Sequence, residues 1–490
     1  MYVVMVAAEC APAAKAGGLG DVVAGLSREL EQLGHDVEVI VPKYASLRYS
    51  EVRDLQPAHR DLPVPWYGGI VRCTVWSGST GGRRCLFIDP DPAAGFFARD
   101  RLYGYGDDAE RFAFFSKAAL EFLTRAGKRP DVIHCHDWQT GLVPVLLYEQ
   151  YAQALPDQRV CYTIHNFRHQ GTSGEQVLRA TGLGRPDHFL DAARLGDDYR
   201  WRGLNPMKGG ILYSNYVTTV SPNYADEALY DDGACGLGRT LKQQQDRFRG
   251  ILNGVEYDAW APDTDPYLPA RYTVATIERK KQNTRALRDR FWLRDSGGPV
   301  VAYVGRLDEQ KGMHLVHHAL FYTLARGGQF ILTGDAHYHD GITDHFRHLK
   351  GYLNDNPDCH LEIGYREDLA HLIYAGADLL VVPSMFEPCG LAPLIAMRYG
   401  TVPVVRATGG MTDTVFDHDH STRPRAQRNG YVFHHTDNQA IESALSRALQ
   451  LHANHPGEFT ALAATCMTAD HSWTRPAHEY LDIYQHIRHK

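Results

Sequence analysis

Short apolar stretches alternate with amphipathic helical segments along this chain, and this order constrains the fold more than any other feature. An apolar stretch at Val3–Ala7 precedes a glycine-containing loop, Lys15–Asp21, after which apolar residues recur at spacings of three and four as far as Leu33. A strand, a loop and a helix in repeated succession are typical of a parallel sheet covered by helices. The same order places backbone N–H groups at a helix N-terminus, where an anion can bind.

The alternation runs in two series, with prolines and Asn253-Gly254 between them as in a linker. A single hydrophobic core rarely exceeds about 250–300 residues, so a chain of 490 residues predicts two doubly wound α/β domains. Residues 169–205 are polar and lack periodicity, which predicts an irregular and mobile segment. The remaining strands are expected at Val37–Val41, Cys85–Ile88, Val132–His136, Val160–Ile164 and Val217–Val220, and then at Val300–Val304, Phe330–Leu332, Leu361–Ile363, Leu379–Val382 and Val402–Val405.

Charge and cysteine content exclude several classes of protein. A net charge of −7 argues against a protein that coats nucleic acid. The chain has no apolar run long enough to span a membrane, and no basic segment precedes its apolar start as in a signal peptide. The nine cysteines include no CxxC pair, so neither a disulfide framework nor a zinc ribbon is expected. We therefore expect a protein of the reducing cytoplasm.

Three loops after expected strands carry residues suited to phosphate. Lys15 with Gly17 and Gly18 matches neither the dinucleotide fingerprint nor the P-loop, so a phosphate loop and a tight turn both remain open. Arg306 offers a bidentate guanidinium and Lys311 a compact charge, and together they suit a pyrophosphate. The alternative interpretation is that this segment is a solvated surface loop.

The most specific local pattern is Pro383–Leu391, which places Glu387 in a loop between an apolar strand and a helix. The glycine and the helix start beside Glu387 would again suit a phosphate. Gly409-Gly410, after the next strand, predicts a third turn of this kind.

The segment His134-Cys135-His136-Asp137-Trp138 resembles a metal site only in its spacing. Both histidines would share one face of a strand, but a structural zinc site needs four ligands and no partner cluster accompanies them. The histidine pairs His317-His318, His337/His339 and His434-His435 fall in different segments without a carboxylate or thiolate grouping, so no metal is expected. Because the segment ends a strand, we instead expect Asp137 to accept hydrogen bonds from hydroxyls, and Trp138 to stack on a sugar or pack locally. Thr163–Asn166 ends a strand in the same way. The bare chemistry indicates a two-domain enzyme that holds a phosphate-bearing ligand in a cleft.

Together these motifs resemble the bacterial glycogen synthases and plant starch synthases, retaining transferases of glycosyltransferase family 5. The region around Met397–Tyr399 and the C-terminal tail look most similar to cyanobacterial synthases and their plant relatives. The matching segments run in order along nearly the whole chain: Lys15–Asp21, Glu110–Phe115, His136–Trp138, Thr163–Asn166, Met207–Ile211, Thr218–Pro222, Gly250–Gly254, Gly305-Arg306 with Lys311-Gly312, Pro383–Leu391, Arg398–Thr401, Gly409-Gly410, Ser472-Trp473 and Tyr480–Tyr484.

The resemblance implies a GT-B fold, in which two Rossmann-like doubly wound domains face each other across a cleft. We place the N-terminal, acceptor-side domain at residues 1–247 and the nucleotide-sugar domain at 248–467. A C-terminal helix within 468–490 would cross back to the first domain. Lys15 and the pair Arg306 and Lys311 would come from different domains, so we expect the cleft to close around the donor.

The implied reaction moves glucose from ADP-glucose to the non-reducing end of an α-1,4-glucan, without metal or other cofactor. Neither a nucleic acid nor a membrane is an expected partner, the oligomeric state stays open, and the plastid stroma replaces the cytoplasm only if a transit peptide has been removed. The resemblance assigns His165, Arg306, Lys311 and Glu387 to catalysis; Lys15, Gly17, Gly18, Asp21, Asn253, Tyr365, Cys389, Gly390 and Leu391 to the donor; and Asp137, Asn166 and Tyr103 to the acceptor.

Three positions depart from related enzymes. Where the family commonly has Thr-Gln, this chain has Ala392-Pro393, which removes a hydroxyl and an N–H that would face phosphate. A non-catalytic or weakly active glucan-binding or priming homologue is therefore an alternative, as is a GT-B transferase with another donor such as UDP-glucose. Where related transferases often carry a second glutamate, this chain has Ile395, so we favour front-face attack over a double displacement through Glu387.

Overall fold

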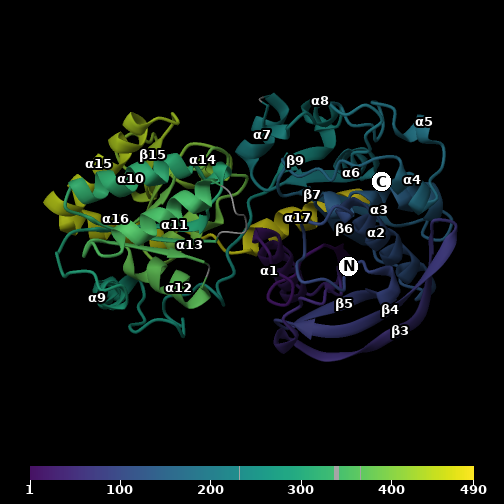
Figure 1. The fold of residues 1–490 in the computed structure, drawn as a ribbon, viewed down its shortest axis with the longest axis horizontal. Helices are drawn as coiled ribbons and strands as arrows, with labels where there is room; N and C mark the ends of the chain where they lie inside the picture. The colour runs from purple at the N-terminus through teal and green to yellow at the C-terminus, as the bar shows by residue number, and fades with distance from the viewer. Residues whose placement is uncertain (231, 336–340, 365, 490) are drawn as a thin grey trace. The chain divides into compact units, whose positions relative to one another are not determined.

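The computed structural model describes residues 1–230, 232–335, 341–364 and 366–489. The chain forms two units, Met1–Gly254 with Trp473–Lys490, and Val255–Ser472 (Figure 1). Unit 1 extends past residue 247 because the short strand β9 (Phe248–Gly250) pairs with the strand before it, β8 (Tyr216–Thr219). Within the described ranges, no helix is long and apolar enough to cross a membrane.

Unit 1 is built on a nine-stranded sheet in the order β3-β4-β5-β2-β1-β6-β7-β8-β9. The strands from β5 to β9 are parallel, whereas β3 and β4 form an antiparallel hairpin at one edge. The remaining bounds are β1 Tyr2–Val6, β2 Asp36–Pro42, β3 Val52–Trp66, β4 Gly69–Thr80, β5 Arg83–Pro90, β6 Val132–His136 and β7 Arg159–Ile164.

Helices pack on both faces of this sheet. On β7, the Thr163 hydroxyl lies 3.4 Å from the Tyr480 hydroxyl of α17 (Thr474–Arg488), while Tyr162 packs against Gly210 of α6 (Pro206–Tyr213). Neighbouring residues of a strand point to opposite faces, so α6 and α17 cover opposite sides. Helix α1 (Gly18–Gln32) contacts α17, and Figure 1 shows the two side by side.

The remaining helices of unit 1 are α2 Asp108–Arg125, α3 Leu142–Leu146, α4 Gln176–Thr181, α5 Pro186–Phe189, α7 Pro222–Tyr230 and α8 Gly238–Lys242. Two of them, α4 and α5, correct the expectation of an irregular segment at 169–205. Isolated bridges join Leu204 to Ser173 and to Gly196, and Leu195 and Leu204 are fully buried. Few apolar anchors hold this polar segment, which is why no periodicity marks it.

Unit 2 is a sheet of six parallel strands in the order β12-β11-β10-β13-β14-β15. Its strand order reverses between β10 and β13, as it does between β1 and β6 in unit 1. In such sheets, ligands bind beyond the carboxyl ends of the strands at the reversal. The strands are β10 Val300–Arg306, β11 Gln329–Asp335, β12 Cys359–Ile363, β13 Leu379–Val382, β14 Val402–Arg406 and β15 Tyr431–Phe433. The helices are α9 Lys280–Arg290, α10 Met313–Ala325, α11 Gly341–Leu353, α12 Glu367–Gly376, α13 Leu391–Arg398, α14 Gly410–Thr414, α15 Asn438–Asn454 and α16 Pro456–Thr468.

Candidate active site

The loop after β1 carries the first group of predicted residues. The Nζ atom of half-buried Lys15 forms an ion pair with Asp21 Oδ1 at 2.8 Å. Gly17 is the N-cap of α1 and Gly18 its first residue, and both are exposed. The N–H of Gly17 donates to buried Glu9 at 2.9 Å. A cation beside an exposed helix start suits a phosphate group.

Asp137 and His165 lie where the neighbouring strands β6 and β7 end. Asp137 Oδ1 accepts the backbone N–H of His165 at 2.7 Å. Asp137 has a φ of 58° and a ψ of −179°, a glycine region that costs another residue about 1–3 kcal/mol. Burial, reinforced by the nearby Glu9 carboxylate, raises the pKa of Asp137 to about 7. A strained residue with a shifted pKa at a strand end is a strong candidate for function.

Three histidines form a row beside Asp137. The rings of His134 and His136 have centroids 4.1 Å apart, and His136 Nδ1 lies 3.1 Å from His165 Nε2. Burial lowers the pKa of His134 and that of His165 to about 3, and it holds the pKa of His136 well below its usual range. All three rings are therefore neutral near pH 7. His165 can exchange hydrogen bonds with a sugar but carries no positive charge.

The C-terminal helix holds one end of this row. The Tyr484 hydroxyl of α17 lies 2.7 Å from His134 Nδ1, and Thr163 Oγ1 lies 2.7 Å from His134 Nε2. Both nitrogens of His134 thus have partners, which fixes the orientation of a ring that is fully buried. Tyr484 therefore belongs to the candidate site, although it is 350 residues from His134 in the chain.

The predicted acceptor residues Asn166 and Tyr103 occupy different loops of unit 1. Asn166 Oδ1 accepts the N–H of Arg168 at 2.9 Å. The Tyr103 hydroxyl donates to Glu9 Oε1 at 2.8 Å, so Tyr103 is bound to the same carboxylate as Gly17. Also in unit 1, a cavity of about 450 Å³ is lined by Trp138, residues 168–172, Asp197, Tyr199 and Cys235.

Asn253, a predicted donor residue, lies at the end of unit 1. It is 5% exposed, and its Oδ1 has no hydrogen-bond partner among the described residues. A buried polar atom left without a partner costs about 1–3 kcal/mol. A hydrogen-bond donor on a ligand would remove this cost, which fits the predicted role.

In unit 2, the predicted residues follow β10 and β13, the two strands at which the sheet order reverses. Arg306 forms an ion pair with Asp308 Oδ2 at 3.0 Å, and its side chain is 43% exposed. Lys311 Nζ lies 2.5 Å from Glu387 Oε2, and the Ser384 hydroxyl donates to the same oxygen at 2.8 Å. The fold thus joins Lys311 and Glu387, which the chain separates by 76 positions.

Close backbone packing holds the loop that carries Glu387. A Cβ at Gly409 would lie 1.9 Å from the Glu387 carbonyl oxygen, and one at Gly410 would lie 2.1 Å from that of Cys389. The close approach of the two backbone segments therefore requires glycine at both positions. The sequence pattern predicts a phosphate turn here, but it does not predict this packing. Cys389 is buried, Gly390 is the N-cap of α13 with a φ of 82°, and Leu391 is the first residue of that helix.

Tyr365, predicted to stack on adenine, lies outside the described residues. Sequence reasoning missed the contributions of Glu9, Ser384 and Tyr484. Glu9 and Ser384 each lie within three residues of the end of a buried parallel strand, as Asp137 does. Their position at a strand end could therefore have marked them as candidates from the sequence. Tyr484 has no local signal, because its partner is distant in the chain.

Comparisons with known proteins agree with this arrangement. Residues 2–243 match the family model described as the starch synthase catalytic domain, and residues 285–460 match that for glycosyl transferases group 1. The chain is 56% identical to glycogen synthase 1 of Synechococcus sp. strain JA-3-3Ab, with 100% of both chains covered. This chain belongs to the glycogen and starch synthase family.

Comparison with solved structures shows that this chain has the GT-B fold. The catalytic domain of starch synthase IV from Arabidopsis thaliana, solved with ADP and acarbose, matches with a TM-score of 0.97 and 41% identity over 100% of this chain and 99% of that one. Sucrose-phosphate synthase from Thermosynechococcus elongatus matches with a TM-score of 0.62 at 19% identity, over 99% and 98% of the two chains. The latter likeness concerns the fold alone. The predicted family and the GT-B fold of two parallel-sheet domains are confirmed.

Proposed function

We propose that this protein transfers glucose from ADP-glucose to the non-reducing end of an α-1,4-glucan, with retention at the anomeric carbon. The observation that carries the proposal is the contact of Lys311, which follows β10, with Glu387, which follows β13 together with Ser384. Arg306 is the last residue of β10. This set lies at the reversal of the sheet, in a chain whose full-length relatives are named glycogen synthases.

We propose that Arg306 and Lys311 bind the donor diphosphate, and that Lys15, Gly17, Gly18 and Asp21 form the donor loop of unit 1. As the bond to ADP breaks, negative charge grows on the leaving phosphate. A cation about 4 Å away at an effective dielectric near 20 interacts with it by about 4 kcal/mol. Because these cations are already ordered, no reorganisation accompanies the reaction.

Glu387 is proposed to bind glucose hydroxyls, while His165 exchanges hydrogen bonds with the sugar as a neutral ring. Lys311 and Ser384 both contact Glu387 Oε2, which fits a carboxylate held for binding. Because Ile395 stands where related transferases often carry a second glutamate, we favour front-face attack, with the leaving phosphate accepting the proton of the acceptor hydroxyl. A covalent glucosyl–Glu387 adduct trapped and seen by mass spectrometry would contradict this.

Asp137, Asn166 and Tyr103 are proposed for the acceptor, together with the cavity beside Trp138. Its polar walls and two aromatic rings suit a sugar chain, which offers hydroxyls at its edges and apolar faces.

We also propose that the reaction needs no metal, because lysine and arginine side chains already neutralise the diphosphate. Activity that survives EDTA would support this, and loss restored by a divalent cation would overturn it. A reducing compartment such as the cytoplasm suits the nine cysteines, all of them described and none of them in a disulfide.

Ala392 and Pro393 lie in the first turn of α13. Relative to Thr-Gln, they remove one hydroxyl and one N–H that would face phosphate, and a hydrogen bond to a charged group is worth about 1.5–3 kcal/mol. We expect the double variant A392T/P393Q to raise kcat/KM for ADP-glucose about tenfold or more. Unchanged kinetics would show that this turn does not contact the donor.

Radiolabelled ADP-glucose or UDP-glucose, incubated with glycogen or maltooligosaccharide, tests the proposal. We expect incorporation into the glucan from ADP-glucose, with label released by an enzyme specific for non-reducing ends. Transfer from UDP-glucose alone would overturn the donor. Tight glucan binding without any transfer would instead indicate a non-catalytic glucan-binding protein.

A further inference from the structure

Glu9 joins two loops that the proposed function assigns to different substrates. Its carboxylate is 3% exposed. Oε2 accepts the N–H groups of Ala16 and Gly17 at 2.7 and 2.9 Å, and Oε1 accepts the Tyr103 hydroxyl at 2.8 Å. One side of this carboxylate therefore holds the donor loop, and the other side holds a residue proposed for the acceptor.

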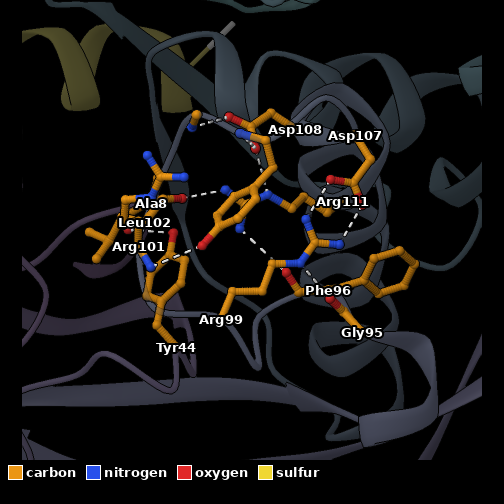
Figure 2. Close-up of polar contacts among 12 residues, drawn as sticks. Ala8, Tyr44, Gly95, Phe96, Arg99, Arg101, Leu102, Asp107, Asp108 and Arg111 are labelled. Carbon is orange, nitrogen blue, oxygen red and sulfur yellow. Dashed lines mark hydrogen bonds and ion pairs between the residues drawn. The ribbon is translucent and has the colours of Figure 1, made fainter. Parts of the chain in front are cut away.

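The loop that carries Tyr103 is fixed from behind by Arg111, whose side chain is fully buried (Figure 2). Its guanidinium donates to the carbonyl oxygens of Phe96 and Leu102, and to Asp108 at 2.8 Å. Leu102 immediately precedes Tyr103, so this loop resists displacement close to the tyrosine.

A second contact holds the same loop across its two ends. Arg99, before Tyr103 in the chain, forms two hydrogen bonds of 2.5 Å with Asp107, which follows it (Figure 2). On the other side, the Tyr44 hydroxyl donates to the carbonyl of Ala8, next to Glu9, at 2.9 Å. Both ends of the Glu9–Tyr103 contact are thus anchored. A glucan that displaced the Tyr103 side chain would therefore act on Glu9, because the backbone on either side of the contact is held.

Glu9 has the chemistry of a coupling group. A carboxylate with three donors on two oxygens cannot keep all of them if either loop moves alone, and a buried donor or acceptor left without its partner costs about 1–3 kcal/mol. The arrangement of Ala16 and Gly17 that satisfies Glu9 also sets the positions of Lys15 and Gly18 in the same loop.

We propose that Glu9 is a positioning residue that couples the donor loop at Lys15–Gly18 to acceptor binding at Tyr103. This inference rests on the proposed function. By linkage, an acceptor that tightens donor binding by some factor must itself be bound more tightly by the same factor when the donor is present.

The test is a set of binding measurements on the full chain. Calorimetry gives the Kd of ADP with and without saturating maltooligosaccharide, and the Kd of the oligosaccharide with and without ADP. Typical couplings are about 5- to 150-fold, and we expect the wild type to lie in this range. In Glu9→Gln and in Tyr103→Phe we expect the factor to fall at least fivefold, and the double variant to lose no more than the larger single loss.

Tyr151→Phe is the matched control, because it removes a buried tyrosine–carboxylate hydrogen bond of the same length, 2.8 Å to Glu121 Oε1, elsewhere in unit 1 and leaves the tie between Glu9 and Tyr103 intact. We expect its coupling to equal that of the wild type even if its Tm falls. Should Glu9→Gln fail to fold, Tyr103→Phe carries the test, since it removes only one donor to the same carboxylate.

Two negative results are distinguishable. A wild type that binds neither ADP nor maltooligosaccharide contradicts the proposed function. A wild type that binds both while Tyr103→Phe and Glu9→Gln keep full coupling overturns the coupling proposal alone, and leaves Glu9 as a structural contact.

Discussion

At the scale of single residues, environment decides what each charged group can do. Lys311 forms an ion pair with Glu387 Oε2, and the Ser384 hydroxyl donates to the same oxygen. The residue types of this cluster could be predicted from the loops that carry them. The Ser384 contact could not, because serine is frequent at the ends of strands and only the folded loop directs its hydroxyl to Glu387.

We expect Lys311→Met to lower kcat with ADP-glucose by about 10²–10³-fold, the effect of removing one preorganised stabilising donor. Steady-state kinetics with glycogen as acceptor measures it. Lys350→Met is the matched control, since Lys350 pairs with Glu362 at 3.4 Å elsewhere in unit 2. A control that loses as much activity as Lys311→Met would contradict the proposed role.

The pKa of Asp137, raised to about 7 by burial, predicts an acidic limb in kcat/KM. Below this pH its carboxyl group is protonated and accepts a hydrogen bond from a glucan hydroxyl more weakly than the carboxylate does, so activity should fall as pH drops through 7. His165, with a pKa near 3, contributes no limb in this range. Asp137→Asn should give a lower but flat profile between pH 5.5 and 8. A limb that survives this substitution would belong to another group.

The linkage to stability has a defined sign for the same residue. A folded pKa above the unfolded value of 3.8 means that the folded state binds the proton more tightly. The stability that protonated Asp137 contributes is present below pH 4 and is lost as the pH rises through 7.

At the scale of elements, buried strands and helices were the best predicted features. Val132–His136 and Leu379–Val382 have the bounds that apolar runs indicated. The hairpin of β3 and β4 was missed because few of its residues are buried and β3 contains three prolines, so no apolar run marks it. A strand at the edge of a sheet that is exposed to solvent does not need alternating apolar residues.

Packing between loops gives a prediction at this scale. Gly409→Ala places a Cβ 1.9 Å from the Glu387 carbonyl oxygen at a φ of 48°, so the Glu387 loop must shift. We expect a loss of stability of about 1–3 kcal/mol in urea unfolding, and a fall in kcat. Gly457→Ala is the control, since open space surrounds it at the start of α16. Equal effects of the two substitutions would refute the packing argument.

At the scale of the whole molecule, the sequence predicted two domains and the family, because its motifs span the chain. The boundary could not be placed from composition alone. Asn253-Gly254 and the prolines after it indicated a linker, but the first domain was expected to end at residue 247, whereas β9 (Phe248–Gly250) completes the first sheet by pairing with β8.

Removal of residues 473–490 should destabilise unit 1, to which they belong. Without α17, His134 loses the Tyr484 hydroxyl, and α1 loses Trp473, whose ring packs against Gly25. Limited proteolysis should then cleave within 1–254 while fragments of 255–472 persist. Cleavage confined to 255–472 would contradict this dependence.

The same connectivity has a consequence for biosynthesis. Unit 1 contains both the first strand and the last helix of the chain, with all of unit 2 between them. A ribosome therefore delivers every residue of unit 2 before the partner of β7 and α1 emerges. During that interval His134 and Thr163, on the sheet face that α17 covers, lack the tyrosines of that helix, so the histidine row gains its anchor only after Tyr484 has been made.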